Sequence, residues 1–138
     1  MPGLEFLDTN VLLYAYDSTE QRKQSIALEL LDRAVLGHMV ISSQVLAEFA
    51  SACLHKIAHR MAPSEVISSL EVLSAITVVP ADLGIVRRAV EAHERYGIHF
   101  YDGMIIAAAE RAGCSRVCSE DLNSGQQYFG IAVENPFR

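Results

Sequence analysis

The chain has 138 residues, and its 17 Asp and Glu residues outnumber its 11 Lys and Arg residues, so the formal net charge is −6 with neutral histidines. This length suits one domain, and a chain of this size buries about two thirds of its unfolded surface without a disulfide or zinc ion. The hydrophobic fraction of 51% and the charged fraction of 20% exclude a disordered chain. Taken alone, the acidity disfavours nucleic acid as a partner, because nucleic-acid-binding proteins usually carry a basic excess.

The three cysteines, at positions 53, 114 and 118, do not form a disulfide framework, because their number is odd and no two have Cys-x-x-Cys spacing. This pattern fits a reducing cytosol. The first residues lack the basic region of a signal peptide, and no stretch approaches the roughly 20 apolar residues of a membrane helix. We therefore expect a soluble, cytoplasmic protein.

Short apolar runs alternate with longer segments of helical pattern along the chain. Strands are expected at residues 4–7, 39–41, 76–79, 116–119 and 131–133, and a polar loop is expected at 120–127. Helices are expected at residues 11–16, 19–36, 43–59, 63–74, 83–97 and 103–112. The candidate N-caps are Asp17 or Ser18, Ser42 or Ser43, and Asp82. Strands separated by helices predict a single three-layer α/β domain over residues 1–138, with a central, mostly parallel sheet of four to five strands and helices on both faces.

Three acids fall near the expected ends of strands or at the start of a helix. Asp8 directly follows the first apolar run, and Asp121 lies two residues after Ser119, which ends the fourth expected strand. Asp102 opens the buried helix at 103–112. Because ligands bind beyond the carboxyl ends of parallel strands, Asp8 and Asp121 lie on the functional edge of the sheet. Each acid alone has a structural alternative, since Asp8 and Asp121 are typical of turns and Asp102 of an N-cap.

Glu48 is the least expected acid, because it lies inside a helix whose apolar stripe includes Val45, Phe49 and Ala52. At about 100° per residue, Glu48 flanks this stripe instead of lying opposite it. Taken alone, it is typical of a solvated edge residue. The functional interpretation rests on the conjunction of the four acids.

Four carboxylates that converge within a few ångströms repel one another by about 4 kcal/mol for each close pair at an effective dielectric constant near 20. A hard divalent cation removes this repulsion, and carboxylate oxygens are the ligands that magnesium and manganese prefer. Such a metal activates water for attack on phosphorus and stabilises the charge on the leaving oxygen. The pattern therefore indicates phosphodiester hydrolysis.

Four segments give the chain a family resemblance. The chain resembles the PIN-domain nucleases, and more narrowly the VapC-like toxins of bacterial toxin–antitoxin pairs. The segments occur in family order and frame almost the whole chain. They are Phe6-Leu-Asp-Thr-Asn-Val-Leu-Leu-Tyr-Ala, Val45-Leu-Ala-Glu-Phe, Phe100-Tyr-Asp-Gly-Met-Ile-Ile-Ala-Ala-Ala and Ser119-Glu-Asp-Leu-Asn-Ser-Gly-Gln.

By this resemblance, the family's acidic quartet, which binds magnesium or manganese and cleaves single-stranded or structured RNA, corresponds to Asp8, Glu48, Asp102 and Asp121. Asp8 and Asp102 are implied as metal ligands, and Asp121 as a ligand directly or through water. Glu48 either completes the metal shell or orients the attacking water as a base. Glu120 is the neighbouring alternative to Asp121 as the fourth acid.

The resemblance also implies supporting residues and partners. Thr9 and Asn10 shape the turn after Asp8, and the Ser119 hydroxyl supports the site beside the fourth acid. Members of the family generally form homodimers and are silenced by an antitoxin that inserts a segment into the acidic groove. The implied partners are therefore an RNA substrate, a VapB-like antitoxin and a second copy of the chain.

Lys56, His59 and Arg60 form a basic group at the end of the helix that contains Glu48. They are candidate phosphate contacts that position RNA. The alternative is a purely structural role, because cations interact favourably with a helix C-terminus. His55 and His59 have the spacing of a zinc site, but no third imidazole or cysteine is placed to join them.

Two other functions compete with a ribonuclease. A haloacid dehalogenase-type hydrolase also begins with an aspartate after its first strand, but its phosphatases use a second aspartate where this chain has Asn10. They also use a lysine before the last acids, and the segment before Asp121 offers only Arg116. A PIN-like module that only binds RNA or a partner usually lacks one of the acids, and this chain has all four.

The net charge has a second interpretation once four acids are assigned to a site. Removing them leaves 13 acids against 11 bases, or −2, and two bound divalent cations would shift the whole-chain charge from −6 to the same value. The acidity then describes a local site that attracts phosphate when metal is bound.

Overall fold

The structure, a computed structural model, describes residues 3–56 and 60–138. Its helices and strands are, in chain order, β1 (Glu5–Leu7), α1 (Thr9–Ala15), α2 (Gln21–Val35), β2 (Met39–Ser42), α3 (Ser43–His55), α4 (Pro63–Leu73), β3 (Thr77–Val79), α5 (Leu83–Tyr96), α6 (Phe100–Arg111), β4 (Arg116–Cys118), β5 (Gln127–Tyr128) and β6 (Ile131–Glu134).

The strands of the described chain form one six-stranded sheet in the order β3-β2-β1-β4-β6-β5. All neighbouring strands run parallel except β5 and β6. After β1, the chain extends the sheet on one side through β2 and β3, and β4 then returns to the other side of β1. The carboxyl ends of β1 and β4 therefore flank the point at which the strand order reverses, which is where α/β sheets bind ligands. Leu7 pairs with Cys118, so Asp8 and Ser119 follow directly after paired residues.

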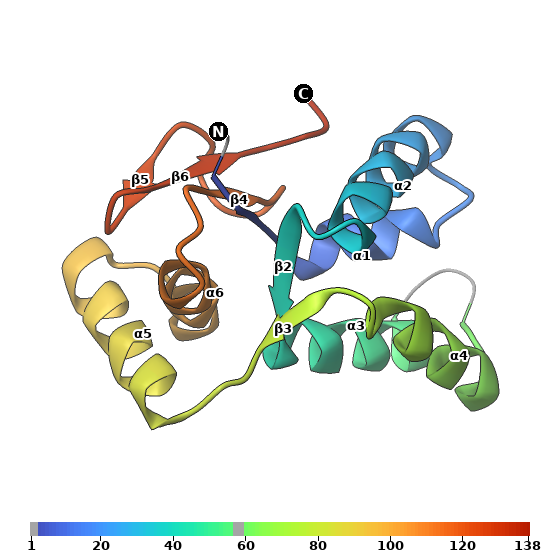
Figure 1. Cartoon of the computed structure of the whole chain (residues 1–138), viewed down its shortest axis with the longest axis horizontal. Helices are drawn as coiled ribbons and strands as arrows, with labels where there is room; N and C mark the ends of the chain where they lie inside the picture. Colours follow the sequence, from blue (N-terminus) through green and yellow to red (C-terminus); the bar gives the residue numbers. More distant parts are fainter. Residues whose placement is uncertain (1–2, 57–59) are drawn as a thin grey trace.

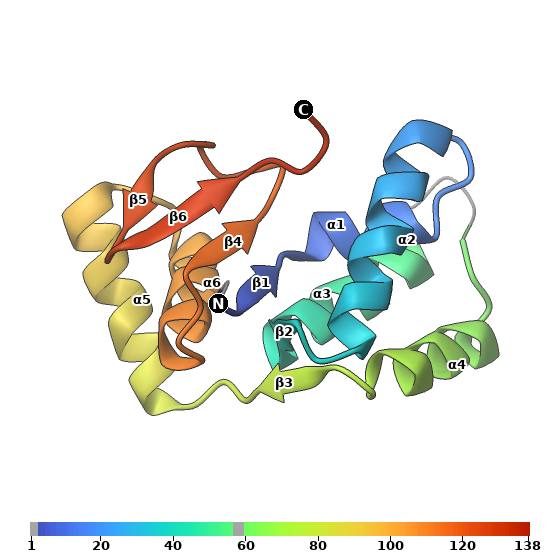
Figure 2. The same ribbon diagram turned by 45° about the horizontal axis from the view of Figure 1, so that its top comes forward.

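Helices cover the two faces of the sheet. Figure 1 shows α5 and α6 on one side and α2, α3 and α4 on the other, and Figure 2 shows α1 continuing directly from β1. The expected three-layer, mostly parallel α/β fold is confirmed. The described residues include no helix that is long and apolar enough to cross a membrane.

The described sheet has six strands, one more than the upper end of the expected four to five. The additional strand, β5, comes from the edge of the segment predicted as a polar loop, and it pairs antiparallel with β6. Phe129 and Gly130 join the two strands with φ angles of 51° and 81°. Positive φ at both central residues is typical of a tight hairpin turn, which usually contains Asn or Gly, so Phe129 gave no turn signal in the sequence.

Several predicted helix ends are confirmed by side-chain caps. The Ser42 hydroxyl accepts a hydrogen bond from the Val45 amide at the start of α3, and the Asp82 carboxylate accepts one from the Ile85 amide at the start of α5. Gly97 ends α5 with φ of 69°, a left-handed conformation that glycine adopts without strain.

Other helix boundaries differ from the expectation. Helix α6 begins at Phe100, and its N-cap is His99, so Asp102 lies inside the first turn and is not a cap. Helix α2 begins after Glu20 instead of being capped by Asp17 or Ser18. Helix α3 ends at His55, short of residue 59, and residues 57–59 lie outside the described part of the chain.

A close contact between α5 and α6 fixes the depth of α6 in the fold. Residues 103–109 of α6 are all buried. A Cβ atom added to Gly103 would lie 2.7 Å from the Ala89 carbonyl oxygen of α5. Because glycine has no side chain, the two helix backbones meet here. The contact also sets the position of Asp102, which is the adjacent residue.

We predict that Gly103→Ala destabilises the protein by about 1–3 kcal/mol, because the added methyl group must push apart two packed helix backbones. In an open helix, the same change would stabilise by about 1 kcal/mol. The measurement is urea unfolding followed by circular dichroism, which suits a chain without Trp. Ser51→Ala, on an exposed position of α3, is the control and should change stability by less than about 0.5 kcal/mol. An increase in stability for Gly103→Ala would contradict the contact.

Candidate active site

Asp8 is held in a buried position at the carboxyl end of β1. Its carboxylate accepts a hydrogen bond of 2.7 Å from the Thr9 amide at Oδ1 and one of 2.8 Å from the Ser119 hydroxyl at Oδ2. Its own amide donates to the Cys118 carbonyl of β4, at 3.0 Å. Asp8 is only 6% exposed. The carboxylate is therefore fixed from both neighbouring strand ends.

Ser119 is the residue that joins the two strand ends. It is fully buried directly after β4. While its hydroxyl donates to Asp8, its oxygen accepts the amides of Asp121 and Leu122 at 3.1 and 3.3 Å. Ser119 therefore connects Asp8 to the loop that carries Asp121.

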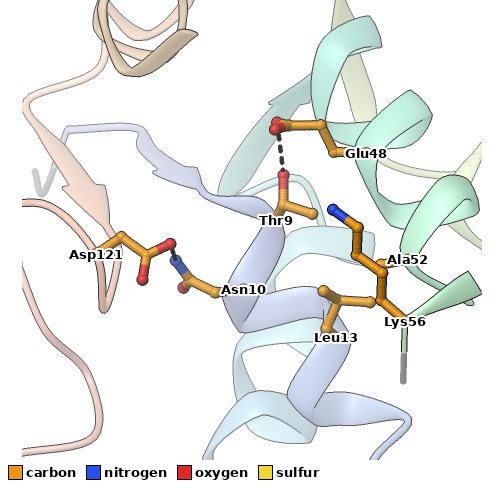
Figure 3. A pocket seen from close by; sticks show the side chains of 7 residues that line it. All are labelled: Thr9, Asn10, Leu13, Glu48, Ala52, Lys56 and Asp121. Carbon is orange, nitrogen blue, oxygen red and sulfur yellow. Dashed lines mark hydrogen bonds between the residues drawn. The ribbon is translucent and has the colours of Figure 1, made fainter. Parts of the chain in front are cut away.

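Asn10 links α1 to the loop after β4. Its side-chain Nδ2 donates to Asp121 Oδ2 at 3.0 Å, and its Oδ1 accepts the Glu120 amide at 3.2 Å. The side chain thus holds both the backbone and the carboxylate of this loop. Figure 3 shows Asn10 and Asp121 facing each other at the edge of a pocket.

Glu48 reaches the same pocket from α3. Its Oε1 accepts hydrogen bonds from the Thr9 hydroxyl at 3.1 Å and from Gln44 Nε2 at 3.2 Å. Gln44 also donates to the Tyr101 carbonyl of α6, at 3.1 Å. Glu48 is exposed, but its carboxylate is held by Thr9 of α1 and by Gln44 of its own helix, which is in turn bound to α6.

The pocket has a volume of about 220 Å³ (Figure 3). It combines two carboxylates, one amine and polar groups of the first turn of α1 with a small apolar wall. Its lining residues are Thr9, Asn10, Leu13, Glu48, Ala52, Lys56 and Asp121.

The pKa of Asp8 shows that the acids interact. Burial, the largest cause, raises this pKa from 3.8 to about 6. The hydrogen bonds from Ser119 and Thr9 oppose the rise, and the charges of Glu48 and Asp121 add to it. Three of the four predicted acids are therefore electrostatically coupled at one edge of the sheet.

Asp102 joins this group from the first turn of α6. Its half-buried position raises the pKa of its carboxyl, and the charge of Asp121 raises it further, while His99 opposes the rise. The charge of Asp121 therefore acts on both Asp102 and Asp8. All four predicted acids lie around the same end of the sheet.

The donor chemistry fits a hard divalent cation, because the four acids offer only carboxylate oxygens. Asp8 is also buried without a cationic partner among the described residues, and its raised pKa reflects that uncompensated charge. Across residues 3–56 and 60–138, however, no group of three or more His, Cys, Asp or Glu side chains is arranged to hold a metal as it stands. Oxygen atoms of Asp121 and Glu48 instead accept hydrogen bonds from Asn10 and Thr9.

Glu120 points to a different set of partners from Asp121. Its Oε2 lies 2.6 Å from the Lys23 amine, and its Oε1 accepts a hydrogen bond from the Tyr14 hydroxyl at 2.8 Å. Burial would raise its pKa, but the hydrogen bonds and charge of these partners lower it instead. Tyr14 and Lys23 could not be found as partners of Glu120 by sequence reasoning, because only the tertiary fold brings α1 and α2 to this loop.

The basic group is only partly accounted for. Lys56 lines the pocket and is also the C-cap residue of α3, so its position fits both a phosphate contact and a charge at the helix end. Arg60 is exposed and is not among the residues that line this pocket. His59 lies outside the described residues.

A PIN domain family model matches residues 6–126 of the chain. The chain belongs to the PIN domain family. The resemblance given by its four sequence segments is therefore confirmed, and the haloacid dehalogenase alternative is set aside. A comparison of this PIN domain with curated proteins found no match.

Solved structures share the fold of this PIN domain. A toxin–antitoxin complex from Klebsiella pneumoniae is similar at 17% identity, with a TM-score of 0.71, over 96% of this chain and 97% of that chain. DNA-bound VapBC from Salmonella typhimurium matches at 21% identity and a TM-score of 0.67, over 97% and 98% of the two chains. Mycobacterium tuberculosis VapC20, a toxin that cleaves the sarcin–ricin loop, matches at 17% identity with a TM-score of 0.67. The match covers 85% of this chain and 89% of that chain. At these identities, the similarity establishes a common fold.

We predict that Asp8 makes the metal-free PIN domain less stable as the pH rises. A folded pKa near 6, above the ordinary 3.8, means that the contribution of Asp8 is favourable below pH 4 and is lost as the pH rises through 6. The stability of Asp8→Asn relative to wild type should therefore increase by up to about 3 kcal/mol between pH 4 and pH 7.5. Urea unfolding in EDTA measures this difference.

The matched control is Asp32→Asn, which removes an exposed carboxylate of α2. Its stability relative to wild type should change far less over the same pH range. If the difference in stability between Asp8→Asn and wild type stays constant with pH, Asp8 is not the group that destabilises the protein as the pH rises.

Proposed function

We propose that this PIN domain is a metal-dependent endoribonuclease that acts as the toxin of a type II toxin–antitoxin pair. The observation that supports it most is the buried Asp8 carboxylate, which lies at the switch point of the sheet and is coupled to Glu48 and Asp121. A carboxylate at this position, without a cation beside it in the described chain, is unfavourable for folding alone. A bound divalent cation would compensate the buried charge of Asp8.

Asp8, Asp102 and Asp121 are the proposed ligands of Mg²⁺ or Mn²⁺. When bound, the metal neutralises the acids and supplies an activated water and charge stabilisation for phosphodiester hydrolysis. All-oxygen donor sets favour these ions over zinc, which binds mainly through nitrogen and sulfur.

The chain's own residues orient the reacting groups. Ser119 and Thr9 hold Asp8, and Asn10 holds Asp121, so these acids need little reorganisation. Glu48, oriented by Thr9 and Gln44, is the proposed base that accepts a proton from the attacking water.

Lys56 is the proposed phosphate contact within the pocket, and Figure 3 shows its amine directed into that space. A cation there positions the RNA backbone without selecting a sequence. Arg60 and His59, which follow α3 in the sequence, are proposed as further contacts to the RNA backbone.

We propose a VapB-like antitoxin as the protein partner, a homodimer as the assembly and the cytoplasm as the place of action. The support comes from the solved structures with this fold, which include a toxin–antitoxin complex and VapBC bound to DNA. An antitoxin that fills the acidic pocket would block both metal and RNA.

We predict that Asp8→Asn lowers RNA cleavage at least 100-fold, because the substitution removes the charge of a buried metal ligand. The measurement is cleavage of a labelled RNA mixture with Mg²⁺ or Mn²⁺, and EDTA should abolish the wild-type activity. Glu29→Gln, on an exposed position of α2, is the matched control and should retain activity.

Two results would contradict the proposal. Cleavage that persists in EDTA and in Asp8→Asn would exclude this mechanism. A wild-type protein that binds RNA or antitoxin but cuts no RNA under any condition would favour a non-catalytic PIN-like module.

A further inference from the structure

Tyr101 is unusual among the aromatic residues of the chain. All five Phe and five Tyr residues lie in the described ranges, and Tyr101 is the one whose side chain is exposed, at 55%. No hydrogen bond to its hydroxyl is found among the described residues. Neither core packing nor a polar contact of the hydroxyl therefore explains an aromatic ring at this position.

The ring is nevertheless held in a defined orientation. It stacks on the exposed imidazole of His99, with centroids 5.7 Å apart and an interplanar angle of 26°. Phe100 contacts it edge-on at 5.2 Å. The Tyr101 amide donates to His99 Nδ1 at 3.2 Å, which fixes the imidazole as the cap of α6. The two rings thus form an exposed stack on a rigid helix start.

This stack lies beside the proposed catalytic acids. Asp102 is the next residue in the chain, and the Tyr101 carbonyl accepts a hydrogen bond from Gln44, which also donates to Glu48. Tyr101 is therefore connected to both the α3 and the α6 side of the acidic site. A phosphate bound by these acids would place the base of a flanking nucleotide one sugar away from them, within reach of the start of α6, where Tyr101 is exposed.

We propose that Tyr101, supported by His99, stacks on an unpaired nucleobase next to the scissile phosphate. The proposal rests on the ribonuclease function and adds to it a residue that contacts the base beside the cleaved bond. A base inside a duplex has both faces covered by its neighbours, so only a single-stranded or loop nucleotide offers a free face. Stacking accepts any base, so Tyr101 selects unpaired RNA without fixing its sequence.

The test uses an unpaired RNA oligonucleotide that the wild-type protein cleaves. Tyr101→Ala should raise KM by about 5- to 100-fold with a smaller effect on kcat, and Tyr101→Phe should remain within about threefold of wild type. Leu36→Ala removes an exposed apolar side chain at the end of α2, and serves as the control that leaves KM unchanged. Thermal unfolding of each variant verifies that it is folded.

An abasic site next to the cleaved bond gives an independent measurement. It should weaken the wild-type interaction as much as Tyr101→Ala does, and it should have little further effect on Tyr101→Ala, since the two changes remove the same contact. Fluorescence anisotropy of the same oligonucleotides measures binding without requiring cleavage.

Several outcomes overturn the proposal. These are an unchanged KM for Tyr101→Ala, equal losses for Tyr101→Ala and Tyr101→Phe, or independent effects of the abasic site and Tyr101→Ala. If Tyr101→Ala leaves RNA kinetics intact but weakens antitoxin binding, the stack is a protein contact instead. If the wild-type protein neither cuts nor binds RNA, both the ribonuclease proposal and the stacking proposal fail. If the protein binds RNA in a way that depends on Tyr101 but does not cleave it, only the ribonuclease proposal is contradicted.

Discussion

The hydrogen bond from the Ser119 hydroxyl to Asp8 is the interaction on which the rest of the site depends. It joins the ends of β1 and β4, which meet where the strand order of the sheet reverses. Because the same oxygen accepts the amides of Asp121 and Leu122, it also sets the direction of the following loop. One buried hydroxyl thus fixes two acids from segments that are more than a hundred residues apart.

Much of this arrangement could be predicted from the sequence, because strand ends are visible as apolar runs that stop at polar residues. Asp8 and Asp121 were placed correctly by that reasoning, and the order of strands and helices indicated a parallel sheet. The cap of α6 could not be predicted, since both His99 and Asp102 precede its buried part and only the backbone geometry distinguishes them. The partners of Glu120 were also missed, because Tyr14 and Lys23 approach it only through tertiary packing.

The net charge of −6 illustrates the difference between composition and location. The acids of the site are held near one another by neutral donors, namely the Thr9, Asn10, Gln44 and Ser119 side chains. Burial is the main reason why the pKa of Asp8 is raised, and the charges of Glu48 and Asp121 add to it; the neutral donors oppose the rise without cancelling the charge. Other acids of the chain are paired with arginines, as Glu110 is with Arg88, and these leave little uncompensated charge. The uncompensated negative charge is therefore concentrated at the site.

The amide of Asn10 restricts which side chain can occupy this position. Its nitrogen donates a hydrogen bond to Asp121, and its oxygen accepts one from the Glu120 amide. The position therefore needs one donor and one acceptor. Aspartate differs from asparagine by a single atom and a single codon base, but it would present oxygen where a donor is needed and set two carboxylates against each other. The change that looks most conservative would therefore keep the acceptor for the Glu120 amide and lose the donor to Asp121.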